Sequence, residues 1–436
     1  MKSSVELDAA RDRYVAQHEA FLNGQSEAAW LRDLRLRAIA RFVDLGFPTT
    51  RHEEWKYTDT RPIAAFNRDQ ALSPNGHSSV ERWQLEGAHR LVFLAGKFAP
   101  ELSQLQELPD GVTVCSLAEA ISRDSEIVQQ NLACYAEFDD AAFVALNTAF
   151  FEDGAFIHVP QNMQVQTPIH LLFLTPDGAL SQPRNLFLIG DNSQITIVEE
   201  YAAKNTQGRG FSNSVTEISA GKNTQIDHYK VTTEGEAAFH VGTMQVQQDR
   251  DCNFSSHSIT FGGQIVRHQA NAVMGESGIE TTLNGLYVGG ADQVIDNHTV
   301  MDHAQPHCNS HEIYAGVLAG RARGVFNGKI FVRLDAQKTD AKQTNRALLL
   351  SSDAEIDAKP QLEIFADDVK CTHGATVGQL DEDALFYLRA RGINQHDAQD
   401  ILTHAFAGEI LERVQIAPLR ERLEQALFAK LQSIRS

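Results

Sequence analysis

The chain has 436 residues and a formal net charge of −19, from 38 basic and 57 acidic side chains. A chain of this length can bury a large core and is expected to form two or three domains. No concentrated run of Lys or Arg interrupts the acidic composition. Nucleic acid and anionic membrane surfaces are therefore excluded as main partners, because both require a concentrated positive face.

Residues 1–154 are expected to form a helical and mixed N-terminal region. The segment SEAAWLRDLRLRAIARFVDLGFP has Ser26 as a candidate N-cap, apolar residues at helical spacing from Trp30 to Ala38, and a Gly-Phe-Pro stop. Further along, RLVFLAG indicates a strand, whereas SLAEAISRDSEIV and DDAAFVALNTAFF indicate helices.

Residues 155–378 change to short strand-like runs separated by turn residues, such as SQITIVEEY, TQIDHYKVTT, NFSSHSITF and VFNGKIFVR. No helix-length periodic segment interrupts them, which excludes a βαβ layout. A polar turn followed by an apolar anchor recurs with gaps of 31, 28, 25, 47 and 30 residues, at Ile195, Ile226, Phe254, Ile279, Phe326 and Ile356. Repeats of this length built from strands predict a β-solenoid, with a β-sandwich as the main alternative.

Residues 379–436 are expected to form a C-terminal helical domain. Asp381 and Asn394 are candidate N-caps, and Gly392 is a candidate helix stop. After Pro418, one apolar stripe at helical spacing consists of Leu419, Leu423, Leu427 and Leu431. Such a stripe typically faces a core, but a role in docking a partner is left open.

The sequence carries no complete nucleotide-binding or hydrolase motif. GVFNGKI has Arg323 where a phosphate loop requires its first glycine, and Ile330 where it requires Ser or Thr. GRGFSN places Asn213 at the third glycine of a dinucleotide fingerprint, and neither G-x-S-x-G nor H-E-x-x-H occurs. Any dependence on ATP would therefore require another chain.

The five cysteines, at positions 115, 134, 252, 308 and 371, form no C-x-x-C pair. Their odd number and wide spacing argue against a disulfide framework and against a zinc finger or ribbon. The charged N-terminal residues do not resemble a signal peptide, and the apolar runs LLFL and ALLL are too short for a membrane span. A cytoplasmic protein with reduced thiols is expected, in which Cys252 is a buried small hydrophobe.

A histidine-rich segment, DNHTVMDHAQPHCNSHE, suggests a metal site. It contains His298, His303, His307, His311, Asp302 and Cys308. Pro306 breaks a helical ligand frame, and histidines in solenoid turns are often solvated or bonded to the backbone instead. The roles of the four histidines and of Cys308 are left open.

A more compact pair lies in ADDVKCTHGAT, where Cys371 and His373 are two residues apart. In an extended strand such residues point to the same side, with Cα atoms roughly 6.5 Å apart. Two donors are too few for a closed metal site, which requires about four ligands. The pair is either structural or half of a site that another chain completes.

The segment AQKTDAKQTNRALLLSSDAEIDAKPQLEIFADDVKCTHGATVGQLDEDALFYLRARGI, residues 336–393, resembles the signature of the SufB/SufD family of iron–sulfur cluster assembly scaffold proteins. The histidine-rich segment extends the resemblance upstream. GFPTTRHEEWKYTD and GINQHDAQDILTHAFAGEIL are similar to the SufD branch. The resemblance implies a right-handed parallel β-helix (solenoid) core flanked by helical N-terminal and C-terminal regions.

The resemblance also implies a non-enzymatic subunit that pairs with a SufB-like scaffold through the β-helix and docks a SufC-like ATPase through its C-terminal helices. The isolated chain is a possible homodimer. His373, with Cys371 as its same-face neighbour, is expected at the junction with SufB, where the two would serve nascent cluster assembly as metal ligands completed by the partner. No stably held cofactor is expected; a transient iron–sulfur cluster at the junction is possible, and flavin association of the complex is left open.

Two alternatives are considered. A SufB-like chain would itself accept sulfur. A β-helix carbohydrate-active enzyme would need a pair of carboxylates in a groove, and only Asp367 and Asp368 are candidates. Adjacent residues in a strand point to opposite sides, so this pair does not suit such chemistry.

Overall fold

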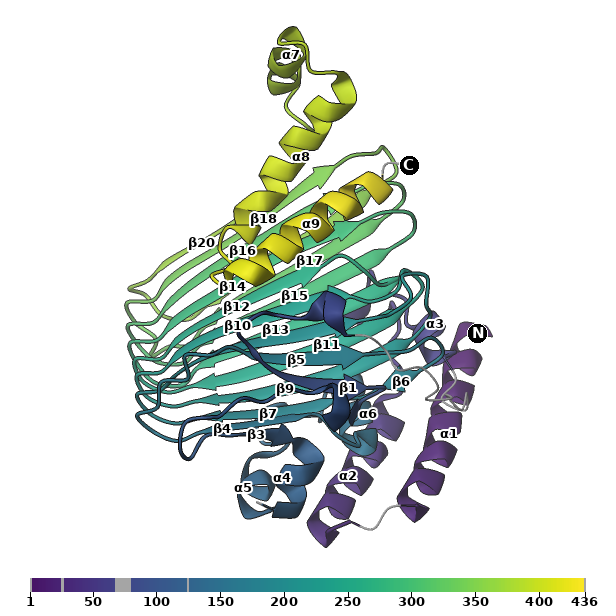
Figure 1. Ribbon diagram of the computed structural model, residues 1–436, viewed down its shortest axis with the longest axis vertical. Coiled ribbons are helices and arrows are strands. Elements are labelled where there is room, and N and C mark those ends of the chain that lie inside the picture. Colours follow the sequence, from purple (N-terminus) through teal and green to yellow (C-terminus); the bar gives the residue numbers. More distant parts are fainter. Residues whose placement is uncertain (1, 25–26, 67–79, 124, 435–436) are drawn as a thin grey trace.

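The computed structural model describes residues 2–24, 27–66, 80–123 and 125–434, and the chain is mainly β with helices at both ends (Figure 1). Two long sheets face each other and form a parallel β-solenoid of about 8 turns. The prediction of a mainly β protein with a solenoid core and helical ends is confirmed. No helix in the described ranges has the length and apolar character that crossing a membrane requires.

The N-terminal helices and short 3-10 turns lie around the first coils of the solenoid (Figure 1). They are α1 Lys2–Asn23, α2 Ala29–Leu45, η1 Glu53–Trp55, α3 Arg61–Ala64, η2 Glu81–Trp83, η3 Pro100–Leu102, α4 Leu117–Arg123, α5 Ser125–Asn131 and α6 Ala142–Phe150. Helix α2 has the predicted apolar face, because Leu34 and Ala38 are buried. It ends at Gly46, whose φ of 62° suits glycine. The candidate N-cap Ser26 lies outside the described residues.

The first sheet, called sheet A, contains every second strand of the solenoid. Its members in chain order are β1 His89–Leu94, β2 Lys97–Phe98, β5 Ile169–Leu174, β8 Gln194–Ala202, β10 Gln225–Thr233, β12 Asn253–Thr260, β14 Glu280–Gly289, β16 Asn309–Leu318, β18 Asp340–Leu349 and β20 Lys370–Gly378. Strand β20 is at one end of this sheet, and the antiparallel pair of β1 and β2 is at the other.

The second sheet, sheet B, contains the intervening strands. They are β3 Thr113–Ser116, β4 Ala155–Val159, β6 Leu180–Ser181, β7 Arg184–Ile189, β9 Phe211–Ala220, β11 Phe239–Gln248, β13 Ile265–Met274, β15 Val294–His303, β17 Arg323–Val332 and β19 Glu355–Ile364. From β7 onward successive strands alternate between the sheets, so each coil contributes one strand to each sheet.

Each coil lies in register on the coil before it. Phe239 pairs with Ile265, 26 residues further along, and Arg323 pairs with Glu355, 32 residues further along. All of the β5–β20 pairings described within the two sheets are parallel. Parallel pairing between coils is the arrangement of a solenoid, and it excludes the antiparallel sandwich considered as the alternative.

The repeat anchors are in register in sheet A only. Ile195, Ile226 and Phe254 pair in succession on β8, β10 and β12. Ile279 precedes β14, where Thr281 is the true partner of Phe254. The remaining anchors, Phe326 and Ile356, lie on sheet B and are two positions out of register with each other. The 47-residue gap between Ile279 and Phe326 therefore reflects a change from sheet A to sheet B as well as a skipped coil.

One corner of the solenoid is built from asparagines. Asn162, Asn192 and Asn223 have φ angles of 65°, 58° and 53°. Asn is one of the few residues that adopt this left-handed region readily. The side chain of Asn223 donates to Asn192 at 3.0 Å, and that of Asn192 donates to Asn162 at 2.9 Å. The three residues thus form a ladder that joins successive corners.

The C-terminal helices are α7 Glu382–Ala390, α8 Gln395–Leu411 and α9 Ala417–Ser433. Their predicted caps are present. The Asp381 side chain accepts two hydrogen bonds from backbone N–H groups in the first turn of α7, and Asn394 accepts one in α8. Gly392, with a φ of 91°, follows the end of α7 as predicted.

The leucine stripe of α9 is core-facing. Leu419, Leu423, Leu427 and Leu431 are at most 3% exposed and pack with residues on the outer face of sheet A. Arg422 of the same helix donates to the carboxylate of Glu200 on β8 at 2.6 Å, which ties α9 to the solenoid. Any docking of a partner by the C-terminal region must therefore rest mainly on side chains outside this stripe.

Replacing Leu423 with alanine is expected to destabilise the chain by about 2–5 kcal/mol, because the substitution leaves a cavity between α9 and sheet A. Chemical denaturation of the isolated chain measures this change. Ile401→Ala is the matched control, because Ile401 is 47% exposed on α8, and its effect should be within about 0.5 kcal/mol. Equal effects of the two substitutions would contradict the packing described for α9.

Candidate functional site

Strands β19 and β20 end the two sheets and together form the terminal coil of the solenoid. Within the described chain, no further strand pairs with the outer edge of either one. Residues that would be interior in another coil are partly open here: Ile364 is 39% and Val377 51% exposed. Unpaired strand edges next to exposed apolar side chains are a template for pairing with another chain.

Cys371 and His373 lie on β20, in the extended conformation that their same-face geometry requires. Cys371 pairs in register with Ala341 and His373 with Gln343, and both of those β18 residues face the solenoid interior. Cys371 is half-buried and packs against the main core, whereas His373 is exposed. The two donors therefore share the interior side of the open terminal coil.

Burial raises the pKa of the Cys371 thiol above its ordinary value, and the neighbouring carboxylate of Asp340 raises it further. The thiol is therefore protonated near neutral pH in the isolated chain. A bound cation would favour the thiolate, because metal binding to cysteine displaces the proton. Cys371 would therefore become a thiolate ligand only when a metal binds beside it.

A thiolate and an imidazole are a donor set that suits ferrous iron and iron–sulfur chemistry. Two donors leave the remaining coordination positions open. Among the described residues, no third His, Cys, Asp or Glu ligand atom is grouped with this pair. The arrangement can hold one side of a metal or cluster, and a second chain at the open end would have to supply the other.

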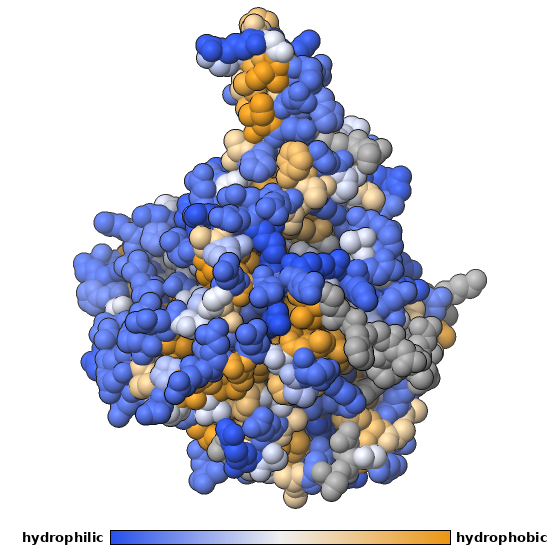
Figure 2. Space-filling view, in the orientation of Figure 1, coloured by the Kyte–Doolittle hydropathy of each residue, from blue (hydrophilic) through white to orange (hydrophobic). Residues whose placement is uncertain are grey.

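The C-terminal arm, formed by α7 and the first turns of α8, projects beyond the end of the solenoid (Figure 1). Apolar side chains gather on this arm in the space-filling view (Figure 2). Phe386 and Tyr387 of α7 are 73% and 56% exposed. Large exposed apolar side chains clustered on one projection are typical of a protein-binding surface.

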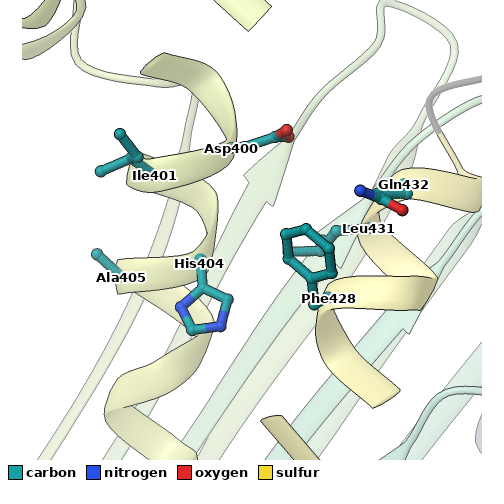
Figure 3. Close-up of a pocket in the computed structure, with 7 residues that line it drawn as sticks. All are labelled: Asp400, Ile401, His404, Ala405, Phe428, Leu431 and Gln432. Carbon is teal, nitrogen blue, oxygen red and sulfur yellow. The ribbon is translucent and has the colours of Figure 1, made fainter. Parts of the chain in front are cut away.

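A hollow of about 300 Å³ lies between α8 and α9, close to this arm (Figure 3). It is lined by Asp400, Ile401, His404, Ala405, Phe428, Leu431 and Gln432. Phe428 is 54% exposed at its edge. The hollow has room for an apolar side chain of a partner. Sequence reasoning missed it, because α8 and α9 contribute single residues that form a surface only after folding.

The four histidines of the histidine-rich segment do not converge. His298 and His311 lie on outer faces of different sheets, whereas the buried His303 bonds Ser310 at 2.9 Å through Nε2. His307 is an exposed corner residue with a φ of 63°. The metal site that the spacing suggested is not formed by these side chains. The four histidines are close in the sequence because they fall on β15, on β16 and on the corner between these strands, where their side chains point in different directions.

His298 instead attaches the N-terminal motif to the solenoid. Its Nδ1 contacts Glu54 at 3.1 Å and its Nε2 contacts Asp296 at 2.9 Å. Asp296 also pairs with Arg267 at 2.5 Å, and the guanidinium of Arg267 lies 4.0 Å from the ring centre of Trp55. These contacts hold the segment HEEWKYTD against the outer face of sheet B.

Cys308 is buried, and its thiol lies 3.3 Å from the carbonyl oxygen of Glu276. Burial raises its pKa. Cys252 is also buried, as predicted, with a pKa of about 12 caused mainly by burial. A buried protonated thiol is a packing residue rather than a nucleophile.

Sequence reasoning missed a buried polar cluster inside the early coils. Glu199 accepts hydrogen bonds from Tyr201 at 2.6 Å and contacts His228 at 3.0 Å, and the Lys230 ammonium lies 4.6 Å from the Tyr201 ring centre. All four side chains are buried. The signal was present in the alternation of TQIDHYKVTT, where His228 and Lys230 share the side of the apolar anchor Ile226.

These observations define a parallel β-solenoid protein whose terminal coil carries Cys371 and His373 on the interior side of β20. Residues 172–406 match the family described as SUF system FeS cluster assembly, SufBD core domain, and residues 11–171 match the SufBD protein N-terminal region. The chain belongs to the SufBD family, which gives it a scaffold role in iron–sulfur cluster assembly, and the predicted family is confirmed.

Curated relatives agree with this membership. An iron–sulfur cluster assembly SufBD family protein of Synechocystis sp. is 35% identical over 98% of this chain and 96% of its own length. The iron–sulfur cluster assembly protein SufD of Escherichia coli is 32% identical over 90% of both chains. The chloroplastic protein ABCI7 of Arabidopsis thaliana is 28% identical over 91% of this chain and 84% of its own length.

Proposed function

We propose that this chain is a non-enzymatic, SufD-like scaffold subunit of a cytoplasmic iron–sulfur cluster assembly complex. The observation that carries the proposal is the open terminal coil, where Cys371 and His373 present two donors beside a strand edge that no other described strand pairs with. The relative named SufD in Escherichia coli covers nearly the whole chain. The chain keeps no cofactor of its own, and the nascent cluster is its cargo.

The proposed first partner is a SufB-like scaffold that pairs through β19 and β20. Such pairing would bury Val377 and Ile364 and would place a second set of ligands opposite Cys371 and His373. Strand addition at an open edge provides main-chain hydrogen bonds, and the apolar side chains provide complementarity. An isolated chain could use the same edge for a homodimer, so the heterodimer and the homodimer would exclude each other.

The proposed second partner is a SufC-like ATPase that docks on the C-terminal arm. Phe386 and Tyr387 would supply the aromatic anchors, and the hollow beside Phe428 would accept an apolar side chain of the ATPase. This arrangement supplies the ATP dependence through another chain, as the lack of a phosphate loop requires.

Val377→Asp is expected to weaken pairing with the SufB-like scaffold by about 100-fold, because it would bury an unpaired charge in the new interface. Val377 is 51% exposed, so the isolated chain should keep its fold. Anaerobic co-purification with SufB-like and SufC-like proteins, followed by iron and sulfide analysis, measures the result. Leu36→Asp on α2 is the control, because Leu36 is also exposed (46%) but lies on the N-terminal side of the fold.

Unchanged co-purification of the Val377→Asp chain would contradict pairing through the terminal coil. The same preparation tests the alternative that the chain accepts sulfur as SufB does. After incubation with a cysteine desulfurase system, persulfide labelling should appear on the SufB-like subunit. Labelling of this chain instead would favour the alternative.

A further inference from the structure

A column of interior side chains lies beneath His373. In sheet A, His373 pairs with Gln343, Gln343 with Glu312, and Glu312 with Leu283. Residues in register on neighbouring parallel strands face the same side, and the strands are about 4.8 Å apart. The Cα atoms of Glu312 and His373 are therefore separated by roughly 10 Å, with only Gln343 between them.

Glu312 is a buried carboxyl group without a cationic partner in the described part of the chain. It is 1% exposed, and it appears in none of the ion pairs found among those residues. Its Oε2 accepts a hydrogen bond from Gln343 Nε2 at 2.7 Å, and the Thr299 hydroxyl is its other polar neighbour. Leu283 beneath it is apolar and buried, so the polar column opens only toward the terminal coil.

The surroundings of Glu312 hold its ionisation near balance at neutral pH. Burial raises the pKa of Glu312 to about 7, although Thr299 and Gln343 favour the charged form. The titratable neighbours of Glu312 in the solenoid interior are Tyr314 and His303. The pKa of Tyr314 is raised, and His303, which contacts Ser310, has a pKa of about 4. Both are neutral near pH 7, so these neighbours leave the ionised carboxylate without a compensating charge in the part of the chain that the structure describes.

Gln343 is held between Glu312 and the terminal coil by the opposite sheet. It is 1% exposed, and its Oε1 has no hydrogen-bond partner among the described residues. A Cβ atom at Gly328 on β17 would collide with the Gln343 amide, so the glycine provides the room that this amide occupies. The Gln343 amide therefore lies between Glu312 and the terminal coil, and because it is neutral it does not compensate the charge of the carboxylate.

We infer that Glu312 is the internal counter-charge of the terminal coil: a cation held by Cys371 and His373 is stabilised through the solenoid interior by the Glu312 carboxylate. This inference rests on the proposed function, because it requires that the terminal coil receive a metal cation. When the cation binds, the Cys371 thiol releases its proton to the solvent, and any Glu312 carboxyl that is still protonated at that pH is driven toward the carboxylate; no electron is transferred.

The expected size of the coupling follows from the separation. With an effective dielectric constant of about 20, the attraction between a divalent cation and a carboxylate roughly 10 Å apart would raise the affinity of the site for the cation by up to about 250-fold. Screening by the solvent at the open end reduces this gain. We expect about a tenfold effect. A glutamine at this position keeps an oxygen that can accept from Gln343 Nε2, and it removes the cost of a buried charge.

The first test needs no metal. For a carboxyl group with a raised pKa in the folded state, stability is greatest below the unfolded pKa and is lost as pH rises toward the folded pKa. Glu312→Gln should therefore raise the melting temperature of the isolated chain at pH 8 relative to the wild type, by about 2 °C or more, with a smaller gain at pH 5. Glu363→Gln, on the solvent side of β19 and 42% exposed, is the control and should show no such pH-dependent gain.

The second test titrates the isolated chain with Co²⁺ under anaerobic conditions at pH 5.5 and pH 8. His373→Ala should abolish the binding, which identifies the site. Glu312→Gln should bind Co²⁺ about tenfold more weakly than the wild type at pH 8 and nearly equally at pH 5.5, where the carboxyl is protonated. Glu363→Gln should follow the wild type at both pH values.

The outcomes separate the inference from the proposed function. Equal Co²⁺ affinity of the wild type and Glu312→Gln at pH 8, or a lower melting temperature of Glu312→Gln at pH 8, would overturn the counter-charge. A wild-type chain that binds no Co²⁺ would overturn it too, because an internal charge acts without the partner. Failure of the proposed function would appear instead as intact cluster assembly by a complex that contains His373→Ala.

Discussion

Replacing His373 with alanine is expected to reduce cluster assembly by the complex by about 100-fold or more, while the chain folds and joins its partners normally. His373 is exposed on β20, so the substitution removes no core packing. It removes one of the two donors that the terminal coil offers, and a metal site loses affinity steeply when its ligand set is incomplete. Iron and sulfide content of the anaerobically reconstituted complex, together with its visible absorption, measures the loss.

Two matched variants sharpen this test. Thr372→Ala changes the neighbouring exposed residue on the opposite side of β20 and should leave assembly unchanged. Cys371→Ser should retain the fold but impair assembly, because a hydroxyl is a poor substitute for a thiolate toward iron. Normal cluster yield from the His373→Ala complex would remove His373 from the site.

The double substitution of Phe386 and Tyr387 by aspartate is expected to weaken docking of the SufC-like ATPase by about 100-fold or more. Aromatic side chains in the centre of an interface often contribute 2 kcal/mol or more each, and a buried unpaired carboxylate adds a further cost. Both residues are exposed in the isolated chain, at 73% and 56%. Binding of the purified ATPase measured by calorimetry gives the affinity directly.

The docking test has an internal control in the same chain. Val5→Asp places a charge at another exposed apolar position, on α1, where Val5 is 65% exposed. This variant should bind the ATPase with wild-type affinity. If the Phe386 and Tyr387 variant also binds normally, the arm is not the docking surface. Substitution is preferable to deletion of residues 379–436, because α9 covers the outer face of sheet A.

The sequence predicted the architecture because the strand runs, the turn residues and the helix caps all indicated the same fold. Alternating strand runs predicted the solenoid strands, and Asp381, Asn394 and Gly392 correctly marked helix ends. The register of the coils was only partly predictable. Sheets A and B carry similar apolar positions, so a single list of anchors mixed Phe254 of one sheet with Phe326 of the other.

The candidate site was predictable in its local geometry but not in its surroundings. The spacing of Cys371 and His373 is enough to place both on one side of a strand. Glu312 and Gln343 stand 61 and 30 residues before His373, and only the register of the coils brings them into one column. A sequence pattern shows alternation within a strand, whereas contact between coils depends on the exact length of every corner.

The interior polar residues have a physical cost that bears on function. The Glu312 carboxyl and the cluster around Glu199 and Lys230 occupy positions that apolar residues fill in other coils. Burying such groups is unfavourable unless they are paired, and a purely structural solenoid would gain stability without them. Their presence is consistent with a chain whose interior serves the chemistry at its end.

The most direct test of the account is amide hydrogen exchange of β20 before and after the SufB-like scaffold is added. In the isolated chain the outer edge of β20 has no strand partner among the described residues, so the N–H groups on that edge should exchange rapidly. In the complex, strong protection is expected at positions 371, 373, 375 and 377, whose outward N–H groups alternate with the Lys370 N–H that bonds Thr339. Complex formation that leaves the exchange of this strand unchanged would show that the open coil and its thiol and imidazole donors meet no partner there.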